Sequence, residues 1–186
     1  MNGQQRLIRA AYHEAGHAVM AYLCGAPLGE LSVTHVSEAG RWDGCRGWLG
    51  PPQRRVADVA GALPGRWLEV EVRCLLAGGV AEARLLGQPN WRWGARDVAA
   101  AAQRARWRGG PRAERTRYLA AQLACTRAQL TAPDAWRAVR SVAAALQQHG
   151  ALDSGRARSL IEVALATSLV IPTQRANARP RALASP

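Results

Sequence analysis

Hydrophobic positions recur at helical spacing along most of the chain. From Gln5 to Leu23 the apolar residues fall on one face of a helix, and Gly25 and Pro27 follow where such a helix should end. Glycine is common just past a helix end, and proline cannot continue one. The same spacing predicts five further helices, at 66–86, 95–108, 112–130, 133–149 and 154–169.

Alternation of apolar and polar residues replaces the helical spacing at 30–36, which predicts a β-strand. A segment punctuated by glycines, 44–50, is a second short strand candidate, and prolines and glycines mark a loop-rich crossing after it. The expected fold class is therefore mainly α (α+β). A small β-hairpin or sheet lies near the N-terminal third, and the helices after Arg112 form a C-terminal helical bundle.

The chain of 186 residues has room for one domain with a core, expected over residues 1–171. Residues 172–186 are rich in Pro, Arg and Ala without any pattern, so a disordered tail is expected there. The sequence has no run of 18 apolar residues and no signal peptide at its start. These features predict a cytoplasmic protein without a membrane span.

The composition is strongly basic, with a formal net charge of +12, and all 25 basic residues are Arg. Because Lys is absent, a P-loop ending in Gly-Lys-Ser/Thr is excluded. The Arg residues are spread along the chain, so a solvated basic surface is favoured over a nucleic-acid partner. The four cysteines form no C-x-x-C pair, which favours reduced, mostly packed thiols: Cys24, Cys45, Cys74 and Cys125.

The first predicted helix contains the pattern H-E-x-x-H, formed by His13, Glu14 and His17. Residues four apart lie on one helical face, so both imidazoles can bind one Zn²⁺ ion. Glu14 is then placed to act as general base on a zinc-bound water. The competing interpretation is two solvated or packed histidines. For the isolated His35 and His149 a surface or packed role is the favoured interpretation.

A catalytic zinc ion usually takes three protein ligands, so a third ligand is expected downstream. The candidates are all carboxylates: Asp43, Asp58, Glu69, Glu71, Glu82 and Asp97. Two stand out by their setting, because Glu82 follows the pair Gly78-Gly79 and Asp97 falls in the first turn of a predicted helix. The residue pattern alone leaves the choice open, since an acidic residue in a first turn is also favoured by the helix dipole. The paired glycines predict close approach of another backbone.

The stretch Tyr12–Ala18 (YHEAGHA) resembles the zinc-site helix of the FtsH-type ATP-dependent metalloproteases. Three other segments are similar to that family and occur in the same order: Gly47-Trp48-Leu49, 75–82 (LLAGGVAE) and 93–98 (WGARDV). The similarity extends to about residue 169. It implies an FtsH-like zinc-peptidase fold in which Asp97 is the third zinc ligand, with Glu82 in reserve. It also implies that Gly47, Trp48 and Leu49 lie in a strand beside the substrate.

The resemblance implies a zinc metalloendopeptidase that hydrolyses peptide bonds in unfolded or flexible polypeptides. This sequence lacks the ATPase module and the membrane anchor of that family. ATP dependence is therefore expected only through a separate ATPase partner, and self-association into an oligomer is a further option for assembly. The alternative is a non-catalytic, zinc-containing, peptidase-like module that binds protein partners.

Overall fold

The computed structural model describes residues 2–33, 64–88 and 94–166, and these form six helices and one small antiparallel sheet. The expectation of a mainly helical chain with a small sheet is confirmed. The elements in chain order are α1 (Gly3–Leu23), β1 (Leu31–Ser32), α3 (Pro64–Leu86), α4 (Ala95–Arg106), α5 (Arg112–Thr131), α6 (Pro133–His149), β2 (Ala151–Leu152) and α7 (Ser154–Ala166).

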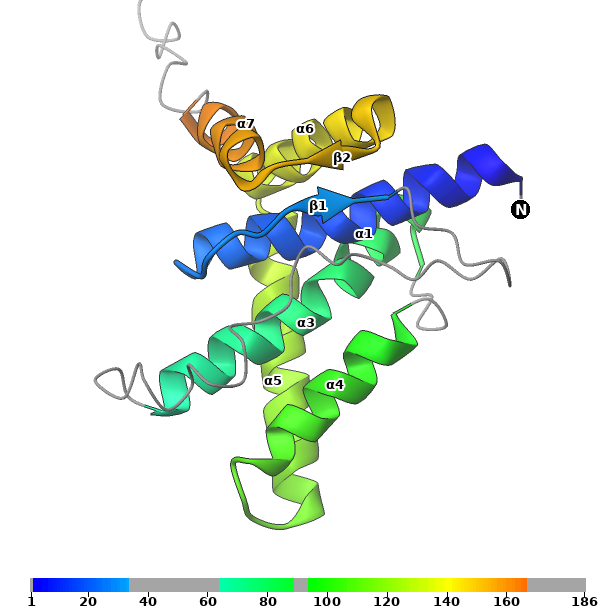
Figure 1. Ribbon diagram of the computed structural model, residues 1–186. Coiled ribbons are helices and arrows are strands. Elements are labelled where there is room, and N and C mark those ends of the chain that lie inside the picture. Colours follow the sequence, from blue (N-terminus) through cyan, green and yellow to red (C-terminus); the bar gives the residue numbers. More distant parts are fainter. Residues whose placement is uncertain (1, 34–63, 89–93, 167–186) are drawn as a thin grey trace, which may run out of the picture.

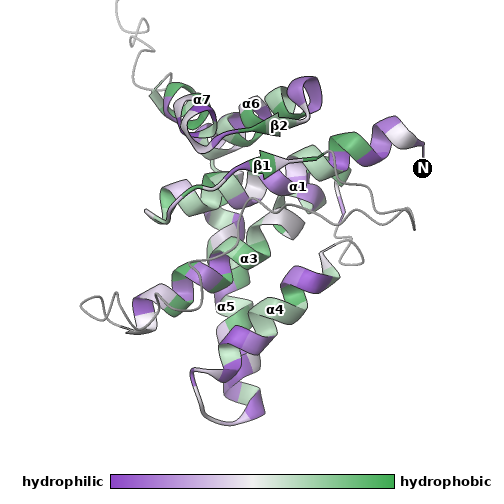
Figure 2. Ribbon diagram, viewed as in Figure 1, coloured by the Kyte–Doolittle hydropathy of each residue, from purple (hydrophilic) through white to green (hydrophobic). Residues whose placement is uncertain are grey.

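Helix α1 lies at the centre of the arrangement, with α3 on one side and α6 on the other (Figure 1). Helix α7 packs against α6, while α4 and α5 pack against α3. The main hydrophobic core fills the space around α1, and a smaller core of Val72, Leu76, Ala101, Ala105 and Tyr118 joins α3, α4 and α5. Hydrophilic residues gather where α4 ends and α5 begins, away from the main core (Figure 2). This arrangement buries the middle of α1, which carries the H-E-x-x-H pattern.

Capping interactions explain where several helices begin and end. The Asn2 side chain accepts a hydrogen bond from the Gln5 backbone N–H at 2.9 Å, and the Gln5 side chain accepts one from the Asn2 N–H at 3.1 Å. This reciprocal pair satisfies two backbone donors at the start of α1. Gly25, with φ of 71°, follows the end of that helix. Asp153 takes the N-cap position of α7, where its carboxylate accepts from the Arg156 N–H at 2.8 Å.

The two strands of the sheet come from distant parts of the chain. Leu31 pairs with Leu152 and Ser32 with Ala151 in an antiparallel register. Both leucines are almost fully buried, so hydrophobic packing holds this short pairing in place. The described sheet is therefore no local hairpin of the N-terminal third, because its second strand lies between α6 and α7. The strand predicted at 44–50 lies outside the described residues.

The C-terminal helices differ from the expected bundle. Helix α6 packs on α1 and α7, but α5 packs mainly on α3. The buried side chains of α5 account for this, because Tyr118 belongs to the smaller core and Gln122 accepts a hydrogen bond from Arg73 of α3 at 2.7 Å. The helices after Arg112 are thus distributed on both sides of the α1–α3 pair.

Helix α3, predicted at 66–86, and α6, predicted at 133–149, match their expected ranges within two residues. The last predicted helix is described as far as Ala166, and the predicted tail at 172–186 lies outside the described residues. Over the ranges that the structure covers, none of the helices combines the length and hydropathy that a bilayer span requires.

Helices α1 and α3 approach each other closely at Gly16. A Cβ atom added there would lie 2.7 Å from the carbonyl oxygen of Ala77 and 2.7 Å from the Cβ of Ala81. Real Cβ atoms are essentially never found so close to other heavy atoms, so only glycine fits between the two helices at their present separation. The glycine of the Tyr12–Ala18 stretch therefore has a packing role in addition to its place in the motif.

Replacing Gly16 with Ala should push α1 away from α3. Overpacking of this kind costs about 1–3 kcal/mol, which would be measured as a lower free energy of unfolding in a denaturant titration. Gly3→Ala is the matched control, because Gly3 lies on the same helix and a Cβ there meets nothing within 4 Å. Equal stability of the two variants would contradict the close packing described here.

Candidate metal centre

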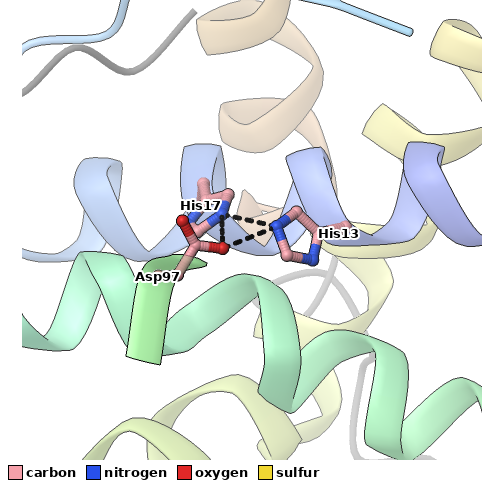
Figure 3. A group of neighbouring side chains, drawn as sticks. All are labelled: His13, His17 and Asp97. Carbon is pink, nitrogen blue, oxygen red and sulfur yellow. Dashed lines mark hydrogen bonds and ion pairs between the residues drawn. The ribbon is translucent and has the colours of Figure 1, made fainter. Parts of the chain in front are cut away.

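Three side chains from two helices converge on one point of the structure (Figure 3). His13 and His17 belong to α1, one turn apart, and Asp97 lies in the first turn of α4. His13 Nε2 lies 3.0 Å from His17 Nε2 and 2.9 Å from Asp97 Oδ2. The distance from His17 Nε2 to Asp97 Oδ2 is 3.5 Å. Each residue thus directs one potential ligand atom into the same small space.

The spacing of these three atoms suits a zinc ion. Zinc bonds of about 2.0–2.1 Å at tetrahedral angles place neighbouring ligand atoms about 3.3 Å apart. The separations here, between 2.9 and 3.5 Å, bracket that value. Two imidazoles and one carboxylate also form a donor set that zinc commonly takes in catalytic sites. The residues present therefore fit the metal that the sequence predicts.

The ring of His13 is held by a carboxylate on its other nitrogen. His13 Nδ1 donates to Glu82 Oε1 at 2.7 Å, and the second oxygen of Glu82 accepts from Arg9 Nη2 at 2.7 Å. Donation from Nδ1 leaves Nε2 as the nitrogen available to a metal ion, as is usual for metal-binding histidines. Glu82, the reserve candidate for third ligand, thus contacts the nitrogen of His13 that faces away from Asp97. Nothing in the sequence linked Arg9 to the site.

The ring of His17 is held in the same way by the backbone of α3. Its Nδ1 donates to the carbonyl oxygen of Cys74 at 2.7 Å. A carbonyl inside a helix normally accepts from the residue four positions later, so this interaction depends on the close approach of α1 to α3. Both imidazoles therefore present Nε2 to the shared space, and both are oriented through Nδ1.

Negative charge surrounds the imidazoles. Burial lowers the pKa of His13, but hydrogen bonds to Asp97 and Glu82 and the charge of Glu14 outweigh it and raise the pKa to about 10. Burial likewise raises the pKa of the Asp97 carboxyl, yet hydrogen bonds from His13 and His17 hold that pKa well below its ordinary value. Surroundings that stabilise a protonated imidazole also stabilise a bound cation. The electrostatics thus favour positive charge between the three side chains.

Glu14 is 3% exposed and follows His13 directly on α1. Its Oε2 atom is buried and has no hydrogen-bond partner among the residues that the structure describes. Buried carboxylate oxygens are almost always paired, so an orphaned one calls for an explanation. A buried carboxylate oxygen without a partner, on the residue after a candidate ligand, is available to accept a proton.

The first of the paired glycines makes room for the histidines. A Cβ atom at Gly78 would lie 2.6 Å from His17 Nε2 and 2.7 Å from both Cε1 and Nε2 of His13. At Gly78 the close neighbours are therefore the imidazole rings, and not the backbone that the paired glycines predicted. Gly79 has a backbone neighbour, because its Cα lies 3.7 Å from the position of a Cβ built on Gly94.

The remaining candidate ligands are placed elsewhere. Glu69 lies 3.6 Å from Arg73, and Glu71 forms a 2.6 Å ion pair with Arg104. His149 is hydrogen-bonded to Arg156 at 2.8 Å, away from the site. The other residues named from the sequence lie outside the described ranges: His35, Asp43, Asp58, Gly47, Trp48 and Leu49.

Comparison with known proteins gives no relative from which a function could be transferred. No protein-family model matches the chain, and no curated protein matches it with significant similarity. A functional assignment therefore depends on the geometry of His13, His17 and Asp97 and on their surroundings.

Purified protein should contain roughly one zinc ion per chain, and the variants His17→Ala and Asp97→Ala should both lose it. Removal of one of three protein ligands weakens a zinc site greatly. Elemental analysis after dialysis measures the stoichiometry. Glu69→Gln is the matched control, because this carboxylate is also among the candidate ligands named from the sequence but pairs with Arg73. Retention of zinc by Asp97→Ala would remove Asp97 from the ligand set.

Gly78→Ala should abolish zinc binding without removing any ligand, because the new Cβ would displace both imidazoles. Gly65→Ala serves as its control, since Gly65 lies on the same helix and a Cβ there meets nothing within 4 Å. Both changes favour helix formation by up to about 1 kcal/mol. A difference in bound zinc between the two variants therefore reflects displacement of the imidazole rings. Full zinc content in Gly78→Ala would contradict the described contact.

Proposed function

We propose that this chain is a zinc-dependent metallopeptidase that hydrolyses peptide bonds in unfolded or flexible polypeptides. The observation that carries the proposal is the convergence of His13 Nε2, His17 Nε2 and Asp97 Oδ2. Glu14, the residue after His13, adds a buried oxygen that has no partner among the described residues. The resemblance of the Tyr12–Ala18 stretch to the FtsH-type metalloproteases supports the same activity.

In this proposal His13, His17 and Asp97 hold the ion, and Glu14 moves the proton. Zinc, when bound, lowers the pKa of water and polarises the carbonyl of a peptide bond. Glu14 accepts the proton of the attacking water on its free oxygen, and it then donates that proton to the nitrogen of the departing amine. Glu82 and the Cys74 carbonyl keep both imidazoles oriented throughout, because they bind the Nδ1 atoms.

A polypeptide substrate, a separate ATPase and self-association remain predictions from the sequence, and so does the cytoplasmic location. The substrate strand at Gly47, Trp48 and Leu49 belongs to the proposal in the same way. Strand addition along such an edge would hold an extended polypeptide through its backbone. Extended binding explains why flexible or unfolded segments are the proposed substrates.

One observation favours a second candidate, a non-catalytic zinc module that binds protein partners. Glu14 and His17 are only 3% and 5% exposed. Structural zinc sites are closed to solvent, whereas catalytic sites keep one position open to water. In the second candidate the ion would hold α1 and α4 together, and no peptide would be cleaved.

The two candidates differ in the behaviour of Glu14→Gln. The proposed peptidase predicts that zinc-loaded wild-type protein cleaves casein, and that Glu14→Gln keeps its zinc but loses about 10²- to 10⁴-fold in rate, the usual contribution of a general base. Cleavage is measured by release of labelled peptides, and zinc content by elemental analysis.

Glu114→Gln provides the control for this change, because Glu114 is an exposed carboxylate at the start of α5. Wild-type rates in Glu14→Gln would exclude Glu14 as the base. Absence of cleavage by zinc-loaded wild-type protein, across pH and divalent metals, would favour the binding module instead.

A further inference from the structure

Three sulfur atoms meet at the end of α1, on the side of Cys74. Met20 lies in α1 and Cys24 is the C-cap residue of that helix, one turn later; Cys24 Sγ lies 3.6 Å from Met20 Sδ. Cys74 reaches the same place from α3, and its side chain is hydrogen-bonded to that of Cys24. The chain has only four cysteines and two methionines, so half of its sulfur atoms gather here.

This cluster combines a closed interior with an opening. Met20 and Cys74 are fully buried, whereas Cys24 is half-buried, so solvent reaches the cluster from the side of Cys24. The hydrogen bond to Cys74 lowers the pKa of Cys24 to about 7, burial opposes this, and the positive charges of Arg73 and Arg66 add to it. The same contact and burial raise the pKa of Cys74, so Cys24 is the thiol that ionises first, and the thiolate is the form that binds metals.

Thiolate and thioether sulfur are soft ligands, and they select Cu⁺ over hard cations and over metals that prefer nitrogen or oxygen. A thioether is an uncommon ligand for zinc, which takes thiolate, imidazole and carboxylate. The presence of Met20 beside the two thiols therefore distinguishes this cluster from a zinc site. Met20 also makes the sulfur cluster chemically different from the candidate metal centre, which consists of imidazoles and a carboxylate.

We propose that Met20, Cys24 and Cys74 form a second metal site that binds one Cu⁺ ion through three sulfur atoms. Binding releases the remaining thiol protons to solvent, and no oxidation or reduction of the protein is required. Arg73 and Arg66 offset the negative charge of two thiolates around a single positive ion. The site is independent of the proposed peptidase activity, although Cys74 contacts both: its carbonyl oxygen holds His17, and its side chain belongs to the sulfur cluster.

The test is a titration of the reduced protein with Cu⁺, supplied without oxygen as its acetonitrile complex, against the competing chelator bicinchoninate. We expect one Cu⁺ per chain that bicinchoninate removes only at high concentration. X-ray absorption at the copper edge should then show three sulfur neighbours. Loss of a residue that only hydrogen-bonds to a metal ligand lowers metal affinity about 10- to 100-fold. Cys24→Ser and Cys74→Ser each remove a ligand itself, so each should lower Cu⁺ affinity by more than that.

Met20→Leu keeps the side-chain volume nearly constant, so the fold should tolerate it. It should lower Cu⁺ affinity at least about tenfold and reduce the sulfur neighbours from three to two. Cys125→Ser is the matched control, because Cys125 is an exposed thiol on α5. His13→Ala is the second control and should leave Cu⁺ binding unchanged, which separates this site from the imidazole site.

Two results would overturn the proposal. One is Cu⁺ affinity that survives in both Cys24→Ser and Met20→Leu, which would place the ion elsewhere. The other is an X-ray absorption spectrum of the Cu⁺-loaded wild-type protein with fewer than three sulfur neighbours, which would remove at least one of the three residues from the ligand set.

Discussion

The contact between α1 and α3 at Gly16 and Ala77 determines the positions of both imidazole rings. Since no side chain separates the helices there, the backbone of α3 comes close enough for the Cys74 carbonyl to accept from His17. The same approach brings Gly78 against the rings and Glu82 against His13. One tight helix pair thus supplies the two candidate histidine ligands and the groups that orient them, and α4 adds Asp97.

The residues on α1 could be predicted from the sequence because their relationship is local. The spacing of His13 and His17 fixes their common face once the helix is known. The assignment of Asp97 depends on the family resemblance, because the spacing of residues within α1 does not indicate which distant carboxylate lies near the histidines. The prediction that Glu82 lies near the histidines is consistent with the structure, but its contact is with Nδ1 of His13, and that contact depends on how α3 crosses α1. Cys74 acts on His17 through its backbone, for which no residue type gives a signal.

The helices were predictable for a similar reason, since periodicity and capping residues such as Gly25 and Asp153 act within a few positions. The sheet was not. Strand β2 has two residues, too few for any alternation to be recognised, and its partner lies in the N-terminal third. The position of α5 also depended on distant contacts, because Tyr118 and Gln122 find their partners on α3 and not on the following helices.

The pairing of Leu31 with Leu152 has a consequence for how the chain is made. A ribosome delivers the N-terminal part first, yet β1 finds its partner only after α6 has emerged. The entropic cost of closing this loop is offset only after residues 151–152 have been made. During synthesis the apolar face of α1 that later meets α6 therefore stays uncovered until α6 emerges, and exposed apolar surface of this kind favours aggregation of incomplete chains.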